Sequence, residues 1–274
     1  MNAKREVAIV IPIYKADLNL LEEISLKQCF LTLHKYPVVA IAPQSLDLSN
    51  IWKYGRFETI ERFDDSFFES VQHYNALMLS PHFYERFLNY EFILIHQLDA
   101  FVFSDQLADW CNTDLDYVGA PWLKRIEVNG LNEVTATFKT WFYTFFNISK
   151  YGVPSDRQFD NVVGNGGFSL RRVERFYKLA TSCKSKMRPY VERTEFKFHE
   201  DVFWSIEVNR RKTRLRIPDY RTAVQFAFEN YPERCLQLND NKLPFGCHAW
   251  DLHIEFWKAY FKKFDFYIDQ SIVR

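Results

Sequence analysis

Continuous runs of apolar residues in the first half of the chain constrain the fold more than any other feature of the sequence. Residues 7–13 and 37–43 are apolar at every position, and residues 92–103 open with four apolar side chains. Such runs are typical of strands that are buried on both faces of a sheet. Between the first two runs, apolar residues recur at helical spacing over residues 18–33. Strands alternating with helices at these short intervals predict a parallel sheet with crossover helices.

The rest of the chain is less regular. Further strands are expected near residues 57–60, 116–121 and 215–218, and further helices near residues 67–78, 105–111, 201–209 and 250–267. Residues 123–163 mix polar loops with an aromatic cluster, and regularity returns at residues 164–170, before a helix and a polar loop that reaches residue 200. No internal repeat and no Gly-, Pro- or Ser-rich linker divides the chain. We therefore expect one α/β domain with an irregular second half.

Composition excludes several classes of protein. The 274 residues include 35 Lys and Arg and 35 Asp and Glu, so the net charge is zero and no electrostatic excess attracts nucleic acid. Apolar residues make up 47%, which excludes disorder for most of the chain. The five cysteines form no Cys-x-x-Cys pair, and no apolar stretch reaches the ~20 residues that span a bilayer. These features predict a soluble cytoplasmic protein with reduced thiols.

Two polar side chains, Gln97 and Asp99, lie near the end of the strand expected at residues 92–103. Because side chains alternate along a strand, residues two positions apart face the same side. A carboxylate in an apolar run is costly unless it is paired, hydrogen-bonded or bound to a metal, and the carboxyl ends of parallel strands line the ligand crevice. Asp99 is therefore either a cap of the next turn or an oxygen ligand for a hard divalent cation that bridges to phosphates.

Gln97-Leu98-Asp99 resembles the Asp-x-Asp motif of nucleotide-sugar-dependent glycosyltransferases with the GT-A fold. Other segments follow in the order of that fold, namely Ile11-Pro-Ile-Tyr14, Tyr74-Asn75, Tyr90-Glu91, Tyr117-Val-Gly-Ala-Pro-Trp122, Gly164-Asn-Gly-Gly-Phe-Ser-Leu-Arg171, Glu200-Asp-Val-Phe-Trp204 and Pro244-Phe-Gly-Cys-His-Ala-Trp250. Together they resemble an incompletely characterised family of GT-A-like bacterial and fungal glycosyltransferases, over nearly all of the chain except about residues 123–160.

The resemblance implies a single GT-A-like domain over residues 1–274, an α/β fold whose Rossmann-like, mostly parallel central sheet is flanked by helices. Residues 1–122 would form the nucleotide-binding half, residues 123–163 an aromatic-rich insertion, and residues 164–274 the acceptor-binding and catalytic half. The family also implies a UDP-sugar donor and a divalent metal, Mn²⁺ or Mg²⁺.

Asp99 and His248 are the metal ligands that the resemblance implies. Imidazole suits Mn²⁺ better than Mg²⁺. Gln97 replaces the first carboxylate of the usual motif, so the metal would depend mainly on Asp99, while the amide of Gln97 can hydrogen-bond a ribose hydroxyl. A histidine beside aromatic residues is also a common core residue, and for His248 this second interpretation stays open.

Glu200 and Asp201 resemble the acidic motif that supplies the catalytic base in inverting enzymes of this fold. A base must lie within hydrogen-bond reach of the acceptor hydroxyl and needs a raised pKa, which an adjacent acid helps to provide. We expect Asp201 to be the base and Glu200 to contact the acceptor hydroxyl. The alternative is that both acids stabilise the start of the helix that follows them.

The remaining contacts implied by the resemblance are to the donor. They are Pro12, Tyr14, Asp47, Asn75, Gln97, Asp99, Gly166 and Gly167 for the nucleotide and sugar, with Arg171 and Arg172 for the diphosphate. Glycine lets a ligand approach the backbone closely. The alternative interpretations are an ordinary turn at Asp47, a tight turn at the glycines, and surface positions for the arginines.

The sequence thus predicts a metal-assisted glycosyltransferase that moves a sugar from a UDP-sugar to an acceptor hydroxyl with inversion, in the synthesis of a cell-surface glycan or its lipid-linked precursor. One alternative is a nucleotidyltransferase of similar fold, although residues 14–17 lack the glycines that such enzymes usually carry after the first strand. The other is a non-catalytic glycan-binding or scaffold protein.

The sequence does not decide what two aromatic segments contact. The apolar side of the helix expected at residues 250–267 can dock onto the protein's own core or contact a membrane as a peripheral anchor. The aromatic residues at 138–151 can line an acceptor groove, form a lid or make a dimer contact. The sequence does not predict the oligomeric state.

Overall fold

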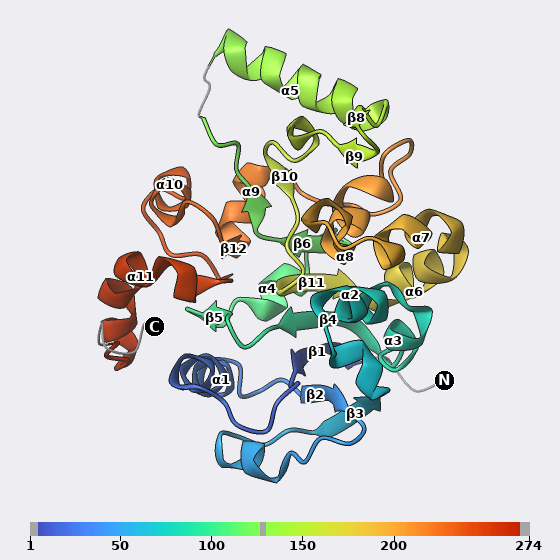
Figure 1. Cartoon of the computed structure of the whole chain (residues 1–274). Coiled ribbons are helices and arrows are strands. Elements are labelled where there is room, and N and C mark those ends of the chain that lie inside the picture. Colours follow the sequence, from blue (N-terminus) through green and yellow to red (C-terminus); the bar gives the residue numbers. More distant parts are fainter. Residues whose placement is uncertain (1–4, 127–129, 269–274) are drawn as a thin grey trace.

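The computed structural model describes residues 5–126 and 130–268, and its centre is a six-stranded sheet (Figure 1). The strands lie in the order β3 (Thr59–Phe63), β2 (Val38–Pro43), β1 (Arg5–Pro12), β4 (Tyr90–His96), β11 (Phe168–Arg172) and β6 (Tyr117–Gly119). Strand β1 pairs in parallel with β2 and β4, and β2 with β3, whereas β11 is antiparallel to both β4 and β6. The predicted α/β fold with a mostly parallel central sheet is confirmed.

Helices cover both faces of this sheet because its central strands are apolar on both sides. Along β1, Val7, Ile9 and Ile11 belong to one core, and Ala8 and Val10 to the other. The first core also contains residues of α1 (Leu20–Thr32), α4 (Leu107–Cys111) and α9 (Tyr220–Phe226). The second contains residues of α2 (Val71–Leu79), α3 (Pro81–Glu85), α6 (Val173–Ser182) and α7 (Lys184–Glu192). This arrangement fixes the carboxyl ends of β1 and β4, where the candidate site lies.

A second, three-stranded sheet includes β5 (Phe101–Val102), the strand that follows β4 in the chain. Its strands lie in the order β12 (Ala227–Phe228), β13 (Gly246–Cys247) and β5, with α10 (Pro232–Leu238) between β12 and β13 in the chain. The helical tail η6 (Trp250–His253), α11 (Ile254–Phe261) and η7 (Lys262–Phe264) packs against it. The rings of Phe101 and Phe261 stack with their centroids 4.1 Å apart. The apolar side of the tail is therefore part of the protein's own core.

Residues 123–163 differ from the predicted loops. They contain a 15-residue helix, α5 (Leu131–Phe145), and a small hairpin of β8 (Ser149–Lys150) and β9 (Val153–Pro154). Pairing of β7 (Pro121–Trp122) with β10 (Val162–Val163) joins the two ends of this segment. The prediction was wrong here because threonine, valine and aromatic residues have low intrinsic helix propensity, so the helical spacing was not recognised.

Smaller differences from the predicted elements occur elsewhere in the chain. Helix α7 occupies part of the predicted polar loop, and the helix expected at residues 201–209 is a short turn, α8 (Glu200–Val202), followed by a π-helical segment, η5 (Phe203–Glu207). Within the described ranges no strand forms at residues 215–218, where the Arg216 N–H donates instead to Asp116 Oδ2 at 2.9 Å. The remaining short helical turns are η1 (Ser49–Lys53), η2 (Asp65–Phe68), η3 (Asp156–Gln158) and η4 (Phe196–Phe198). Within residues 5–126 and 130–268, no helix has the length and hydropathy of a bilayer span.

Candidate active site

A cleft of about 540 Å³ lies at the carboxyl ends of β1 and β4. Its walls come from residues that follow β1, from the starts of α1 and α2, from the turn after β4, and from the start of the helical tail. Three of the lining residues, Glu22, Asp99 and Asp251, are carboxylates, and none of the described lining residues is Lys or Arg. Glu22 is paired with Lys15, whose Nζ atom lies 2.8 Å from Glu22 Oε2, so the acidic character of the lining comes mainly from Asp99 and Asp251.

The turn after β4 places Gln97 and Asp99 in this cleft. The sequence had predicted a longer strand with both side chains on one face. Strand β4 instead ends at His96, so the two side chains lie in a turn. The Gln97 N–H donates to the Gly167 carbonyl at 2.8 Å, and the Ala100 N–H donates to the Gln97 carbonyl at 3.0 Å. The Asp99 side chain remains 40% exposed and lines the cleft. The cleft thus has an accessible carboxylate held by a hydrogen-bonded turn.

His248 lies between two carboxylates. Its Nε2 atom is 3.2 Å from Asp99 Oδ1, and its Nδ1 atom is 3.2 Å from Glu229 Oε1. Burial lowers the pKa of His248, but the charges and hydrogen bonds of Asp99 and Glu229 outweigh it and raise that pKa to about 10. Burial likewise acts to raise the pKa of Asp99, and His248 outweighs it and holds that pKa below its usual range. The imidazolium therefore serves as the positive charge between the two acids.

Asp99, His248 and Gln97 present a donor set that fits a divalent cation once His248 loses its Nε2 proton, because the cation would then replace that proton as the positive charge beside Asp99. Gln97 Oε1 lies 3.2 Å from the same Nε2 atom that contacts Asp99, so an amide oxygen, a carboxylate oxygen and an imidazole nitrogen meet at one place. Glu229 can accept the Nδ1 proton, which is how a carboxylate orients a metal-binding histidine. No group of three or more His, Cys, Asp or Glu side chains suited to a metal occurs among the described residues, so phosphate or water oxygens would complete the coordination.

Gly166 and Gly167 are required by close packing around this cluster. A Cβ atom at Gly167 would lie 1.9 Å from His248 Nε2 and 2.5 Å from Gln97 Oε1. A Cβ atom at Gly166 would lie 2.1 Å from Glu200 Oε1. Neither glycine has a positive φ angle, so steric space and not backbone conformation explains both residues. The glycine loop therefore packs against the cluster that contains the proposed ligands.

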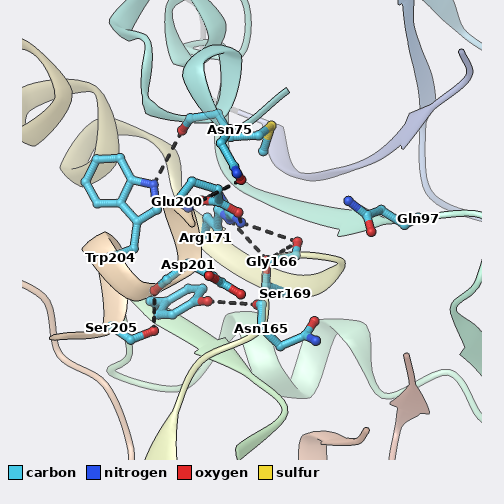
Figure 2. A network of polar contacts seen from close by, with 12 residues as sticks. Asn75, Gln97, Asn165, Gly166, Ser169, Arg171, Glu200, Asp201, Trp204 and Ser205 are labelled. Carbon is cyan, nitrogen blue, oxygen red and sulfur yellow. Dashed lines mark hydrogen bonds and ion pairs between the residues drawn. The ribbon is translucent and has the colours of Figure 1, made fainter. Parts of the chain in front are cut away.

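Glu200 and Arg171 form a buried ion pair behind the glycine loop (Figure 2). Their side chains are 4% and 0% exposed, and Arg171 donates to both carboxylate oxygens, at 2.8 and 3.1 Å. The Asn75 side chain accepts the Glu200 N–H at 3.3 Å. None of these three residues lines the cleft. Each of these side chains is used inside the protein, and the predicted contacts of Glu200 with the acceptor, Asn75 with the nucleoside and Arg171 with the diphosphate stay predictions.

Asp201 lies beside this ion pair at the start of α8 (Figure 2). Its Oδ1 atom accepts the Val202 N–H at 2.8 Å. Burial, together with the negative charges of Glu200 and Glu229, raises the pKa of Asp201 to about 7. A carboxyl group with this pKa can exchange a proton near neutral pH, which is the property that a general base requires.

The other predicted donor contacts divide into two groups. Pro12 and Tyr14 line the cleft, and their contact with the donor stays a prediction. Asp47 does not line it, because its carboxylate accepts from the N–H and hydroxyl of Ser49 at 2.9 and 3.1 Å, so it is the ordinary turn residue that was the alternative. Arg172 also lies outside the cleft, with its Nε atom 3.2 Å from Asp116 Oδ1.

Sequence reasoning missed four residues of the site. Glu229 contacts His248, and Asn165 donates to Glu229 Oε1 at 2.6 Å. Tyr74 lines the cleft with a buried hydroxyl that has no hydrogen-bond partner among the described residues. Asp251 also lines the cleft, and burial together with the charge of Asp99 raises its pKa. Asn165 and Tyr74 lie in segments already singled out, whereas no sequence pattern marks Glu229.

Residues 58–248 match the model of a family described as protein of unknown function (DUF5672), and the chain belongs to this family. The match includes Gln97, Asp99, Asp201, Glu229 and His248, and it ends at His248. No match is found among curated proteins.

Solved structures of glycosyltransferases align with this chain, and the alignment with LgtC supports a shared fold. The galactosyltransferase LgtC, crystallised with donor and acceptor sugar analogues, aligns with a TM-score of 0.52 at 13% identity, over 88% of this chain and 86% of LgtC. GlyE from Streptococcus pneumoniae TIGR4 has a TM-score of 0.49 at 12% identity, and mouse xyloside xylosyltransferase 1 has 0.48 at 10%. These alignments cover 90% and 89% of this chain, but only 54% of GlyE against 97% of the mouse enzyme. The fold is of the GT-A type.

Proposed function

We propose that this protein is a glycosyltransferase that moves a sugar from a UDP-sugar to an acceptor hydroxyl with the help of a divalent cation. The observation that carries the proposal is the meeting of Asp99, His248 and Gln97 beside a carboxylate-lined cleft in a GT-A fold. The fold alone does not define an activity, and the cluster supplies the chemistry that the proposal needs.

The charge of the cleft supports the need for a cation. A nucleoside diphosphate is an anion, yet the cleft is lined by Glu22, Asp99 and Asp251 without a lysine or arginine among its described lining residues. Lys15 pairs with Glu22 at 2.8 Å, so Asp99 and Asp251 are the acids that would repel the diphosphate most once His248 gives up its proton. A cation between them and the diphosphate removes that repulsion. When bound, Mn²⁺ or Mg²⁺ would neutralise the charge that develops on the departing diphosphate. Asp99 and His248 would hold it, with Gln97 as a third ligand or as a ribose contact.

Donor binding would use the wall of the cleft that follows β1. Pro12 and Tyr14 offer an apolar surface and a phenol ring against which a nucleobase can stack. The hydroxyl of Tyr74 lies in the same cleft beside the Gln97 side chain, where it can hydrogen-bond the donor. These contacts orient the nucleoside and leave the diphosphate near Asp99.

Asp201 would act as the base for the acceptor. As the acceptor oxygen bonds to the anomeric carbon and the bond to the diphosphate breaks, Asp201 takes the hydroxyl proton, and attack opposite the leaving group inverts the anomeric centre. The raised pKa of Asp201 suits this role at neutral pH. Glu200 assists through its charge, since Arg171 and Asn75 hold it next to Asp201.

The acceptor that we propose is a cell-surface glycan or its lipid-linked precursor, and the compartment is the cytoplasm. The five cysteines support a reducing compartment, because all are buried and none is bridged within the described chain.

A thermal-shift panel tests the proposal directly. UDP, GDP, ADP and CDP are added with and without Mn²⁺ to the wild type, to Asp99→Asn, and to the control Asp47→Asn, which changes an exposed acid outside the cleft. We expect UDP with Mn²⁺ to raise the Tm of the wild type and the control but not that of Asp99→Asn. Release of UDP from UDP-sugars then separates turnover from binding. Absence of stabilisation by every nucleotide would contradict the proposal and favour a scaffold protein.

A further inference from the structure

Helix α5 is oriented with its apolar face away from the protein. The side that faces the body carries the polar residues of the helix: Glu133, Thr137, Thr140 and Thr144 line a groove between α5 and the segment around residues 209–221, together with Ala136, Trp141 and Phe145. None of the residues of α5 is buried. In a helix that stabilises its own domain, the apolar stripe faces the core, so α5 has the reverse arrangement. Figure 1 shows this helix at the edge of the molecule, next to β8.

The outer face of α5 is large and aromatic. We define it by five residues that recur at helical spacing and are 40–85% exposed: Leu131, Val134, Phe138, Phe142 and Phe146. Immediately after the helix, Ile148 and Tyr151 are also exposed, at 37% and 92%. Isolated exposed apolar residues need no explanation, but a contiguous face of this kind marks an interaction surface.

Positive charge surrounds this face. Residues 134–155 contain Lys139 and Lys150 and no Asp or Glu. The Arg211 guanidinium lies over the Phe145 ring, 4.4 Å from its centroid, and both residues line the inner groove. Glu133, the acid of α5, is on the inner side, where its Oε1 atom accepts from Arg221 at 2.6 Å. The surface that α5 presents is therefore apolar in its centre and basic around it.

We propose that the outer face of α5 lies in the surface of an anionic lipid membrane. Aromatic side chains with flanking Lys and Arg are the composition of helices that lie in the interface between lipid headgroups and acyl chains. The bases would contact the headgroups while the rings enter the acyl boundary. This inference rests on α5 and its surroundings and does not depend on the proposed glycosyl transfer.

A second copy of the chain fits this face less well than a membrane. A two-fold interface would bring the same patch of both chains together. It would place Lys139 and Lys150 of both copies in one interface, with no acid between residues 134 and 155 to compensate them. Like charges placed opposite each other disfavour association, whereas anionic lipid attracts them.

Vesicle co-sedimentation tests the proposal. The full-length protein is mixed with phosphatidylcholine vesicles, alone or with about 30 mol% phosphatidylglycerol, a composition that gives a negative surface potential. The test variant is Phe138→Glu/Phe142→Glu. The matched control is Leu31→Glu/Leu252→Glu, which places the same two charges at positions 69% and 73% exposed outside α5. Tm values of all three proteins show whether each is folded.

We expect the wild type and the control to bind the anionic vesicles, and the α5 variant to bind at least about tenfold more weakly, because two charges replace two inserted rings. Raising NaCl to about 0.5 M should weaken wild-type binding, since salt screens the attraction of Lys139 and Lys150. The proposal is overturned if the wild type ignores anionic vesicles, or if the α5 variant binds as well as the control. The proposal is also overturned by a particular light-scattering result. In that result the wild type is a dimer, the α5 variant is a monomer, and adding vesicles does not dissociate the wild-type dimer.

Discussion

Replacing Arg171 by methionine should destabilise the fold strongly, because it removes the partner of a buried carboxylate. The Arg171 and Glu200 side chains are 0% and 4% exposed, and the guanidinium also donates to the hydroxyls of Tyr84 and Ser169 at 2.9 and 3.0 Å. Methionine keeps the apolar stem but leaves Glu200 charged and unpaired. Breaking a buried pair in this way costs about 3–5 kcal/mol, which lowers the Tm of a domain of this size by roughly 5–10 °C.

Thermal unfolding at pH 7 measures this effect against a matched control. Arg188→Met makes the same substitution in an Arg–Glu pair at 2.6 Å whose side chains are 76% and 55% exposed, and it should cost less than about 1 kcal/mol. The double variant Arg171→Met/Glu200→Met removes both charges and should be more stable than Arg171→Met alone. If Arg171→Met and Arg188→Met shift the Tm equally, or if the double variant is the less stable one, the reasoning about this pair is wrong.

Three further predictions concern the site. Asp201→Asn should lower turnover by about 10²–10⁴-fold with UDP binding retained. The kcat of the wild type should fall below pH 7 as Asp201 becomes protonated, and a flat pH profile of kcat contradicts this. The same variant should raise the Tm at pH 8, where the folded protein must ionise a buried acid of raised pKa, and the gain should vanish near pH 4, below which Asp201 is protonated in both states. Glu229→Gln should weaken Mn²⁺ binding by about 10–100-fold in calorimetry, and unchanged affinity would exclude its role in orienting His248.

The sheet could be predicted because its evidence is local. Continuous apolar runs at β1 and β2 and helical spacing over α1 fix strand, helix and strand in order. Helix α5 was missed because none of its residues is buried in a core, and because its threonine and aromatic residues have low helix propensity. Helix α7 was missed because it is polar and contains Pro189.

The residues of the site could be predicted where a sequence motif lies at the end of an expected strand or in a segment that resembles the family. Asp99 follows an apolar strand, and His248 lies in a segment recognised by resemblance; the structure brings these two side chains within 3.2 Å of each other. Glu200 could not be assigned from sequence, because its role depends on Arg171, which lies 29 residues away in the chain. Glu229 was missed for the same reason, since only the fold brings it to the imidazole of His248.

The most direct test of the account is a crystal structure with UDP and Mn²⁺, using anomalous scattering to locate the metal. The account predicts one anomalous peak bound by Asp99 and His248, with the diphosphate as a further ligand and the direct contact between the two side chains replaced by metal bonds. A nucleotide bound in this cleft with its metal elsewhere, or with the contact between Asp99 and His248 intact, would contradict the central claim.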